Sequence, residues 1–237
     1  FHVLSALRPT VSIDRLAMHI LSGAPAGEEG RLILSDAQRG NRVYAAAMRV
    51  IDYAFALTIL LGFWWVLLAA WIAIRRDSPG PGIFGQPRIG RYGKVFTCWK
   101  FRTMQVGTTQ AGTHEVSASA VTKVGAFLRR TKIDELPQVW NILRGEIALI
   151  GPRPCLPVQT QLIEARQQRG VLDVLPGSSG LAQVEGIDVG NAASLGDPLR
   201  LARRDADNVA LRGVLPDIRL ILRTARGGGQ GDRVARP

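Results

Sequence analysis

The stretch Tyr53–Ile74, YAFALTILLGFWWVLLAAWIAI, holds 22 consecutive residues without a charged side chain. A straight α-helix of that length would extend about 33 Å, which is enough to cross the hydrocarbon core of a bilayer. The alternative is the buried core helix of a globular domain. The length of the segment and its large apolar side chains on every face argue against that alternative. We therefore expect a helix that enters a membrane.

Arginine clusters flank the apolar segment on both sides. Positive charge on loops marks the cytoplasmic side of a membrane. A spanning helix would leave one cluster outside, whereas a helix that enters one leaflet, bends and returns keeps both inside. The charges therefore favour a re-entrant helix over a spanning one, although Gly62, near the middle, kinks a helix only weakly. The flanking cations are Arg39, Arg42 and Arg49 before the segment and Arg75, Arg76, Arg88 and Arg91 after it.

The whole chain of 237 residues is strongly basic, with a formal net charge of +11 and a pI near 10.9. Such a charge predicts an anionic partner: nucleic acid, an anionic membrane surface or a phosphorylated substrate. Nucleic acid is disfavoured, because no basic face with aromatic platforms and no known reading motif is present. Cys98 and Cys155 lie far apart and in no metal-ligand spacing, which argues against a disulfide framework or a zinc site.

Periodicity and turn residues predict a mainly α-helical fold with one small β-hairpin. The hairpin surrounds the turn RYGK at residues 91–94, and residues 105–120 are expected to form a loop. Residues 175–186 are also expected to be a loop. A strand is expected in the run GEIALI, at residues 145–150. The predicted helices lie at residues 124–130, 134–145 and 158–170, and a further helical stretch at 196–223 is interrupted at Pro216.

This pattern divides the chain into four parts. An N-terminal extension, which includes a short amphipathic helix in SIDRLAMHIL, has no assigned role. The membrane-inserted helix and a cytoplasmic domain follow it, and a glycine-rich basic tail comes last. The boundaries are 1–46, 47–77, 78–226 and 227–237.

Two adjacent carboxylates open the stretch TKIDELPQVWNILRG, residues 131–145. Pro137 fits only the first turn of a helix, so the helix is expected to begin with Asp134 as N-cap and Glu135 in the first turn. Helix capping is the ordinary explanation for such a pair. The apolar face of this helix consists of Leu136, Val139, Trp140 and Leu143.

A reacting pair is the alternative explanation for the two carboxylates. A helix N-terminus also favours phosphate, and many cations lie nearby in the sequence. An ionised Asp134 is a competent nucleophile for phosphoryl transfer. Glu135 would then hold Mg²⁺, which typically takes one or two carboxylates together with phosphate oxygens.

Three blocks of the sequence resemble the signatures of the bacterial sugar transferases, also called monotopic phosphoglycosyl transferases or polyprenyl-phosphate hexose-1-phosphate transferases. The resemblance covers about residues 47–226. It implies transfer of a sugar 1-phosphate from a UDP-sugar to undecaprenyl phosphate, with UMP released, through a covalent intermediate and with Mg²⁺. It also implies a helix that is broken within one leaflet of the bacterial inner membrane and contacts membrane lipids. The catalytic domain would face the cytoplasm. The resemblance leaves open whether the protein forms a homo-oligomer. The blocks are GQPRIGRYGKVFTCWKFRTM, VGAFLRRTKIDELPQVWNILRGEIALIGPRP and PGSSGLAQVEG.

The resemblance also assigns roles to individual residues. Asp134 matches the nucleophile that becomes phosphoglycosylated, and Glu135 belongs to the Mg²⁺ site. The turn GPRP, formed by Gly151, Pro152, Arg153 and Pro154, resembles the turn that contacts the nucleotide. Further substrate or phosphate contacts are expected at Arg88, Lys100, Arg102, Arg129 and Gln183.

The chain departs from the family pattern at several positions. Trp64 and Trp65 stand where members commonly have the Ser-Pro of the helix break. The third block carries Leu175, Glu185 and Ile187 in place of arginine, asparagine and arginine, which points to a different sugar. The sequence EGID at 185–188 and the glycine-rich tail with GDRV at 231–234 resemble members that act on N-acetylated deoxy-amino sugars. Ala120 replaces a further arginine. A catalytically impaired, membrane-anchored scaffold of a glycan assembly complex is the alternative function; the intact DELPQ and GPRP sequences argue against it.

Overall fold

The computed structural model describes residues 42–108, 120–187 and 197–226. The expected amphipathic helix near the N-terminus therefore lies outside the described residues. The described chain is mainly helical with two small sheets, so the predicted fold class is confirmed in its secondary structure.

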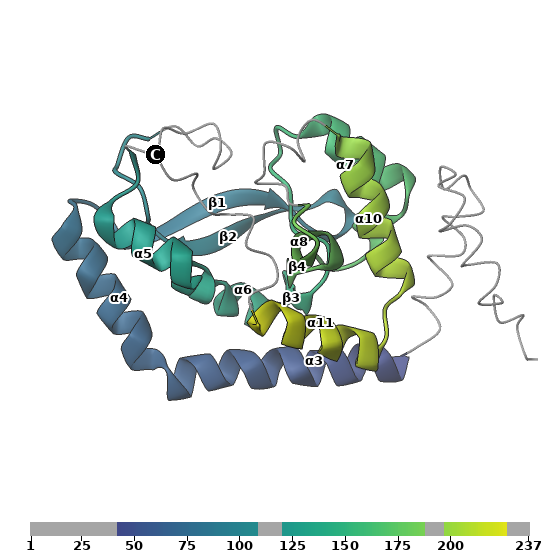
Figure 1. The fold of residues 1–237 in the computed structure, drawn as a ribbon, viewed down its shortest axis with the longest axis horizontal. Coiled ribbons are helices and arrows are strands. Elements are labelled where there is room, and N and C mark those ends of the chain that lie inside the picture. Colours follow the sequence, from purple (N-terminus) through teal and green to yellow (C-terminus); the bar gives the residue numbers. More distant parts are fainter. Residues whose placement is uncertain (1–41, 109–119, 188–196, 227–237) are drawn as a thin grey trace, which may run out of the picture.

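The long apolar segment is not one helix. Helix α3 (Arg42–Leu57) continues into a π-helical turn, η1 (Thr58–Gly62), and the chain then leaves helical geometry at Phe63 (φ −120°, ψ 18°) before α4 (Trp64–Asp77) begins. Figure 1 shows α3 along the lower edge of the molecule and α4 turning steeply away from it. The expected break is therefore present, one residue before the tryptophans.

The π-helical turn explains how the break forms without proline. A π-turn adds a residue to the helical repeat and is one of the identifiable causes of a sharp kink. The Thr58 hydroxyl donates to the Ala54 carbonyl at 2.8 Å, a back-bond that also tends to bend helices. Because Gly62 has nothing within 4 Å of the position of a Cβ, packing does not require glycine there.

The surface around the break is strongly apolar. By length and composition alone, the helix over Val43–Gly62 could cross a membrane, with a mean hydropathy of 1.5 and 17% of the measured stretch buried. Leu61 is 75% exposed, and Trp64 and Trp65 are each 57% exposed. Contiguous exposed apolar side chains of this size mark an interaction surface rather than ordinary solvent-facing positions.

The hairpin is confirmed. Strands β1 (Ile83–Ile89) and β2 (Val95–Phe101) pair antiparallel, with Gln86 opposite Cys98. The turn between them places Tyr92 (φ 59°) and Gly93 (φ 72°) in the left-handed region.

A second sheet joins two short segments in parallel. Strand β3 (Ala148–Ile150), expected as a strand, pairs with β4 (Gly177–Ser179). The expectation of a loop over residues 175–186 is therefore wrong, since this stretch holds both β4 and the short helix α8 (Leu181–Val184). A parallel pair has no sequence signal of its own when each strand is only three residues long.

The remaining helices match the predicted ranges closely. The stretch at 196–223 is interrupted at residues 211–213, not at Pro216, because Pro216 lies in the first turn of α11, where its missing N–H costs no hydrogen bond. These elements are α5 (Lys123–Thr131), η4 (Ile133–Gln138), α6 (Val139–Arg144), α7 (Thr160–Gln168), η5 (Val171–Asp173), α10 (Pro198–Ala210) and α11 (Val214–Ala225).

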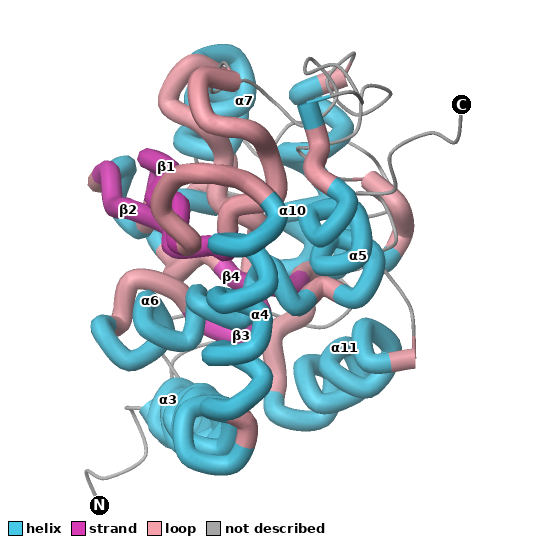
Figure 2. Tube along the Cα trace, turned by 90° about the vertical axis from the view of Figure 1, so that its left-hand side faces the viewer, coloured by secondary structure: helices cyan, strands magenta, loops and turns pink. Residues whose placement is uncertain are grey.

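Apolar clusters connect these elements. Helix α4 packs on α5 and β2 through Ile74, Phe101 and Leu128, and α3 packs on α6 through Ala56 and Ile142. Helices α7, α8 and α10 contribute to the third cluster. Seen from the side, α3 lies below the sheet formed by β3 and β4, with α11 beside it (Figure 2). Helix α3 thus lies along the lower edge of the domain, and α4 rises along its side to pack against α5 and β2 (Figure 1).

Candidate active site

The carboxylate pair lies in a turn of 3₁₀-helix, not at an α-helical cap. Lys132 (φ 60°, ψ 14°) ends α5 in the left-handed conformation and begins η4, so the helix starts at Ile133. The expectation that Asp134 is the N-cap is therefore wrong. Its side chain caps no backbone N–H, because the sharp turn at Lys132 already closes the junction. Gly145 (φ 76°) ends α6 as expected.

Glu135 is held by two cations from different parts of the chain. Its Oε1 accepts a hydrogen bond from Lys100 Nζ at 3.0 Å and from Arg153 Nη2 at 2.7 Å. All three side chains are at most 16% exposed. Burial opposes the charge of Glu135, but Arg153, Lys100 and Lys132 outweigh it and hold the pKa of this carboxyl well below its usual range.

Asp134 has the opposite environment. It is only 9% exposed, and among the described residues its Oδ1 has no hydrogen-bond partner. Burial, followed by the negative charge of Glu135, raises the pKa of Asp134 to about 6. A carboxylate that is desolvated and unpaired, yet still ionised at neutral pH, is suited to act as a nucleophile.

The turn GPRP, residues 151–154, is held through its carbonyls. Pro152 and Pro154 have no N–H, so this segment cannot be fixed by a ladder of backbone donors. The carbonyls of residues 152–155, the last of which directly follows the turn, instead accept hydrogen bonds, each at 2.9 Å. The pairs are Gly177 N to Pro152 O, Arg166 Nη1 to Arg153 O, Arg88 Nη1 to Pro154 O and Ile89 N to Cys155 O.

Glycines of the third block allow the turn to pack against β4. A Cβ on Gly177 would lie 2.0 Å from the backbone N of Gly151, and one on Gly180 would lie 2.5 Å from the Gly151 carbonyl oxygen. Real Cβ atoms do not approach backbone this closely. The PGSSG sequence therefore has a packing reason for both glycines, which is to bring the third block against the GPRP turn.

The structure gathers only part of the predicted site around Glu135. Lys100 and Arg153 reach it directly. Arg88 instead donates to Gln86 Oε1 and the Pro154 carbonyl. Arg102, which is 7% exposed, donates to Ser78 and to the carbonyl oxygen of Pro81 after α4.

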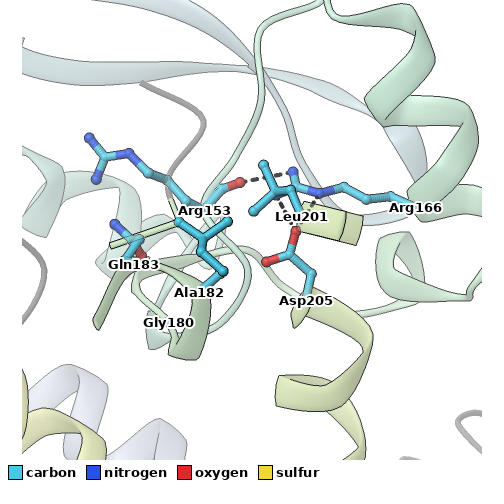
Figure 3. A pocket seen from close by; sticks show the side chains of 8 residues that line it. Arg153, Arg166, Gly180, Ala182, Gln183, Leu201 and Asp205 are labelled. Atoms are coloured by element: carbon cyan, nitrogen blue, oxygen red, sulfur yellow. Dashed lines mark hydrogen bonds and ion pairs between the residues drawn. The ribbon is translucent and has the colours of Figure 1, made fainter. Parts of the chain in front are cut away.

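Arg129 lies near Asp134, and Gln183 lies beside Arg153. Arg129 donates to Thr103 Oγ1 at 2.9 Å and is close enough to lower the pKa of Asp134 in part. Gln183 lines a small pocket beside Arg153 (Figure 3). Its Nε2 donates to the Ser178 carbonyl at 3.3 Å, and its buried Oε1 has no partner among the described residues.

Sequence reasoning missed the buried pair Arg166 and Asp205, and it missed the connection from α3 to β3. Asp52 accepts a hydrogen bond from the Leu149 N–H at 2.9 Å and pairs with Arg49 at 3.1 Å. In the sequence, Arg166 and Asp205 sit in polar helical stretches that look like solvent-facing surface. Only the packing of α7 on α10 shows that both are buried.

The side chains near Glu135 could hold a hard divalent cation such as Mg²⁺ only if oxygens of a phosphorylated substrate completed its coordination. The described residues contain no group of three or more His, Cys, Asp or Glu side chains that could hold a metal. Glu135 offers one carboxylate, and Mg²⁺ commonly takes one or two carboxylates when phosphate oxygens and water complete its shell.

Comparison with known proteins gives a consistent result. The family model described as bacterial sugar transferase matches residues 43–229. The chain is 35% identical over 192 residues to the UDP-glucose:undecaprenyl-phosphate glucose-1-phosphate transferase of Xanthomonas campestris pv. campestris, which covers 77% of this chain and 38% of that protein. It is 36% identical over 185 residues to the protein of the same name from Caulobacter vibrioides, covering 74% of this chain and 67% of the relative.

A third relative carries a different sugar in its name. The undecaprenyl-phosphate galactose phosphotransferase of Salmonella typhimurium is 34% identical over 162 residues, which is 58% of this chain and 32% of the relative. The chain thus spans about a third of the length of the Xanthomonas and Salmonella proteins and two thirds of the Caulobacter protein.

Proposed function

Since the chain belongs to the bacterial sugar transferase family, we propose that it transfers a sugar 1-phosphate from a UDP-sugar to undecaprenyl phosphate. The observation that carries this proposal is the environment of the carboxylate pair. Asp134 is buried and unpaired at Oδ1, and the neighbouring Glu135 is held by two cations. A nucleophile and a set of groups able to meet a diphosphate therefore lie together beside an apolar, membrane-type helix.

In the proposed first step, the Asp134 carboxylate attacks the phosphorus that carries the sugar. A bond forms from the carboxylate oxygen to this phosphorus, and the bond to the bridging oxygen breaks. UMP leaves with the electron pair. In the second step a phosphate oxygen of undecaprenyl phosphate attacks the same phosphorus, and the Asp134 carboxylate departs. The product is a polyprenyl diphosphate-linked sugar, and Asp134 is regenerated without a net proton change on the enzyme.

The cations around Glu135 provide charge where the phosphates arrive. Arg153 presents a planar fork that matches phosphate oxygens, and Lys100 adds a compact charge. We propose that these side chains turn from Glu135 towards the donor diphosphate, which would free Glu135 as a ligand. Mg²⁺ held by Glu135 would neutralise phosphate charge. Charge stabilisation and positioning supply most of the catalysis in phosphoryl transfer, and these residues account for both.

We further propose that α3, η1 and α4 form a re-entrant membrane helix in the bacterial inner membrane, with both ends on the cytoplasmic side. The break at Phe63 and the exposed Trp64 and Trp65 support this topology. Arg75 and Arg76 occupy the last turn of α4 and would remain in the headgroup region. This arrangement would place Asp134 at the level where a polyprenyl phosphate headgroup lies.

For the sugar, we propose an N-acetylated deoxy-amino sugar over glucose or galactose. The support is the third block, which carries Glu185 and Ile187 where members of the family commonly have asparagine and arginine. Ile187 packs against the apolar cluster of α7, α8 and α10, so its side chain offers no hydrogen-bond donor to a sugar hydroxyl.

The test is a screen for UMP release in membranes or detergent. The purified chain, Mg²⁺ and undecaprenyl phosphate would be incubated with UDP-glucose, UDP-galactose and UDP-linked N-acetylated deoxy-amino sugars. Release that depends on undecaprenyl phosphate supports the proposal, and the best donor identifies the sugar. No release from any donor, with a folded protein that still binds UDP, would favour the scaffold alternative.

A further inference from the structure

Helices α7 and α10 are connected by an ion pair that is almost fully buried. Arg166 Nε and Nη2 donate to one oxygen of Asp205, Oδ2, at 2.9 and 2.6 Å, and the two side chains are 2% and 3% exposed. Burial opposes the charge on Arg166, and Asp205 outweighs it and raises the pKa of the guanidinium. Buried pairs of this kind often add little stability over apolar residues of similar volume, so their presence calls for another reason.

The third donor of Arg166 points out of the pair. Its Nη1 donates to the backbone carbonyl of Arg153 at 2.9 Å. Figure 3 shows this bond and both bonds to Asp205 converging on the Arg166 guanidinium. The Arg153 side chain extends from the other side of its backbone, away from Arg166, and its Nη2 reaches Glu135. One backbone unit therefore joins the buried pair to the candidate active site.

Arg153 needs such a support because its neighbours lack donors. Pro152 and Pro154 flank it, and neither can contribute an N–H to hold the turn. The carbonyl of Arg153 is the one acceptor in the turn that receives a side-chain donor from α7. A guanidinium carried on a flexible side chain depends on its backbone anchor for accuracy.

We infer that Arg166, held by Asp205, is a positioning residue for the transfer reaction: it fixes the backbone of Arg153 so that the Arg153 guanidinium meets Glu135 and the donor phosphates. The inference rests on the proposed function, because its kinetic test measures transfer from a UDP-sugar. Arg166 is 2% exposed and its guanidinium donates to Asp205 and the Arg153 carbonyl, so it is not placed to meet the donor or the acceptor itself. Its effect passes through Arg153.

The test removes the pair in two ways. The double variant Arg166→Met with Asp205→Leu replaces both ends by apolar residues, so that no unpaired charge is left buried. Arg166→Lys keeps the charge beside Asp205 but cannot serve both Asp205 and the Arg153 carbonyl with one ammonium group. Both variants are made in the natural chain and in an Arg153→Ala background. The control is Leu162→Ala. Leu162 is also on α7 and is 3% exposed, and its truncation loosens the apolar cluster between α7, α8 and α10 without removing a polar bond.

The measurements are kcat/KM with the best UDP-sugar, the Kd for UDP, and the unfolding midpoint. With Arg153 present, we expect a loss of about 10- to 100-fold in kcat/KM and weaker UDP binding in whichever variants fold. With Arg153→Ala, we expect less than about threefold further loss, because the residue through which Arg166 acts is already gone. Leu162→Ala should lower the midpoint and leave kcat/KM within about threefold.

The inference is overturned by unchanged kcat/KM and UDP affinity in a folded variant of the pair. Equal losses with and without Arg153, or a comparable loss in Leu162→Ala, would also overturn it. If the natural chain turns over no UDP-sugar, the proposed function fails, and the UDP titrations across the same variants still decide the positioning role.

Discussion

The carboxyl groups of Asp134 and Glu135 are adjacent in the chain, and their surroundings shift their pKa values in opposite directions. Burial and the charge of Glu135 raise the pKa of Asp134 to about 6, while Arg153, Lys100 and Lys132 outweigh burial and hold that of Glu135 well below its usual range. Two neighbouring acids separated in this way are suited to different tasks. Asp134 can be the reacting carboxylate, and Glu135 stays ionised throughout the working pH range.

The pH dependence of turnover should follow Asp134. The nucleophile reacts as the carboxylate, so kcat/KM should rise with pH through about 6 and level off above it. Below pH 6 we expect a fall of about tenfold per pH unit. A profile measured from pH 4.5 to 8.5 checks this, with UDP affinity recorded in parallel. An acid limb with a midpoint near the ordinary value for aspartate would contradict the description of Asp134.

Asp134→Asn should abolish transfer and should not harm the fold. Loss of the nucleophile is expected to cost at least about 10³-fold in kcat. Between pH 4 and 6 the Asp134 carboxyl, with its raised pKa, binds a proton in the folded state that it has lost in the unfolded state. The free energy of unfolding therefore falls as pH rises through that range and stays lower above it. Asparagine does not ionise, so it removes the cost of burying a charged carboxylate. At pH 8 we therefore expect an increase of about 1–3 kcal/mol in the free energy of unfolding.

A matched control for that substitution is Glu164→Gln, a carboxylate on α7 away from the candidate site. It should leave both kcat and the unfolding midpoint unchanged within error. Near-normal turnover in Asp134→Asn would rule out Asp134 as the nucleophile.

Deletion of Leu60 should straighten the membrane segment. A π-helical turn holds one residue more than the α-helical repeat, so removing one residue from Thr58–Gly62 allows α3 to continue into α4. We expect the variant to expose its two ends on opposite sides of the membrane and to lose transfer activity. Single cysteines at the exposed positions Ala45 and Pro79, in a chain whose two natural cysteines are replaced by serine, would report this by labelling from outside.

The same labelling applied to the chain without the deletion tests the re-entrant topology. Both cysteines should be protected from an impermeant reagent in intact cells. Labelling at one end only would mean that the helix spans the bilayer, in which case the break at Phe63 serves another purpose.

Gly177→Ala should separate the third block from the GPRP turn. The added Cβ would meet the backbone N of Gly151 at 2.0 Å, and no flexible side chain can give way there. We expect a cost of about 2–4 kcal/mol in stability and a loss of UDP affinity. Gly62→Ala, where a Cβ meets nothing within 4 Å, is the control and should leave UDP binding unchanged. A Gly177→Ala variant with natural stability and UDP affinity would contradict the close approach.

Several features could be predicted from the sequence because they depend on local patterns. The apolar run of Tyr53–Ile74 predicted helix, which α3, η1 and α4 confirm, and alternation around RYGK predicted the hairpin. Gly145 as the end of α6 followed from its position after the last apolar residue. The three family blocks identified the transferase family, which the match over residues 43–229 confirmed.

Other features depend on contacts between distant segments. The sequence placed Asp134 at a helix cap, but the left-handed conformation of Lys132, imposed where α5 meets η4, removed that role. Arg88 and Arg102 match positions expected to contact phosphate, and only the structure shows that they donate hydrogen bonds to Gln86, Pro154, Ser78 and Pro81. A basic residue looks the same in the sequence whether it faces a substrate or a carbonyl.

By itself, the sequence determined the family, the apolar segment and the identity of the two carboxylates, since composition and periodicity act over a few neighbouring residues. Only the tertiary structure decided which cations meet Glu135, where the apolar helix breaks, and how the GPRP turn is held. Lys100, Glu135 and Arg153 come from a strand, a 3₁₀-helix and a turn that are distant in the chain, and Arg166 and Asp205 lie 39 residues apart. The physical reason is that buried charges must find partners. Packing brings those partners together without regard to distance along the chain.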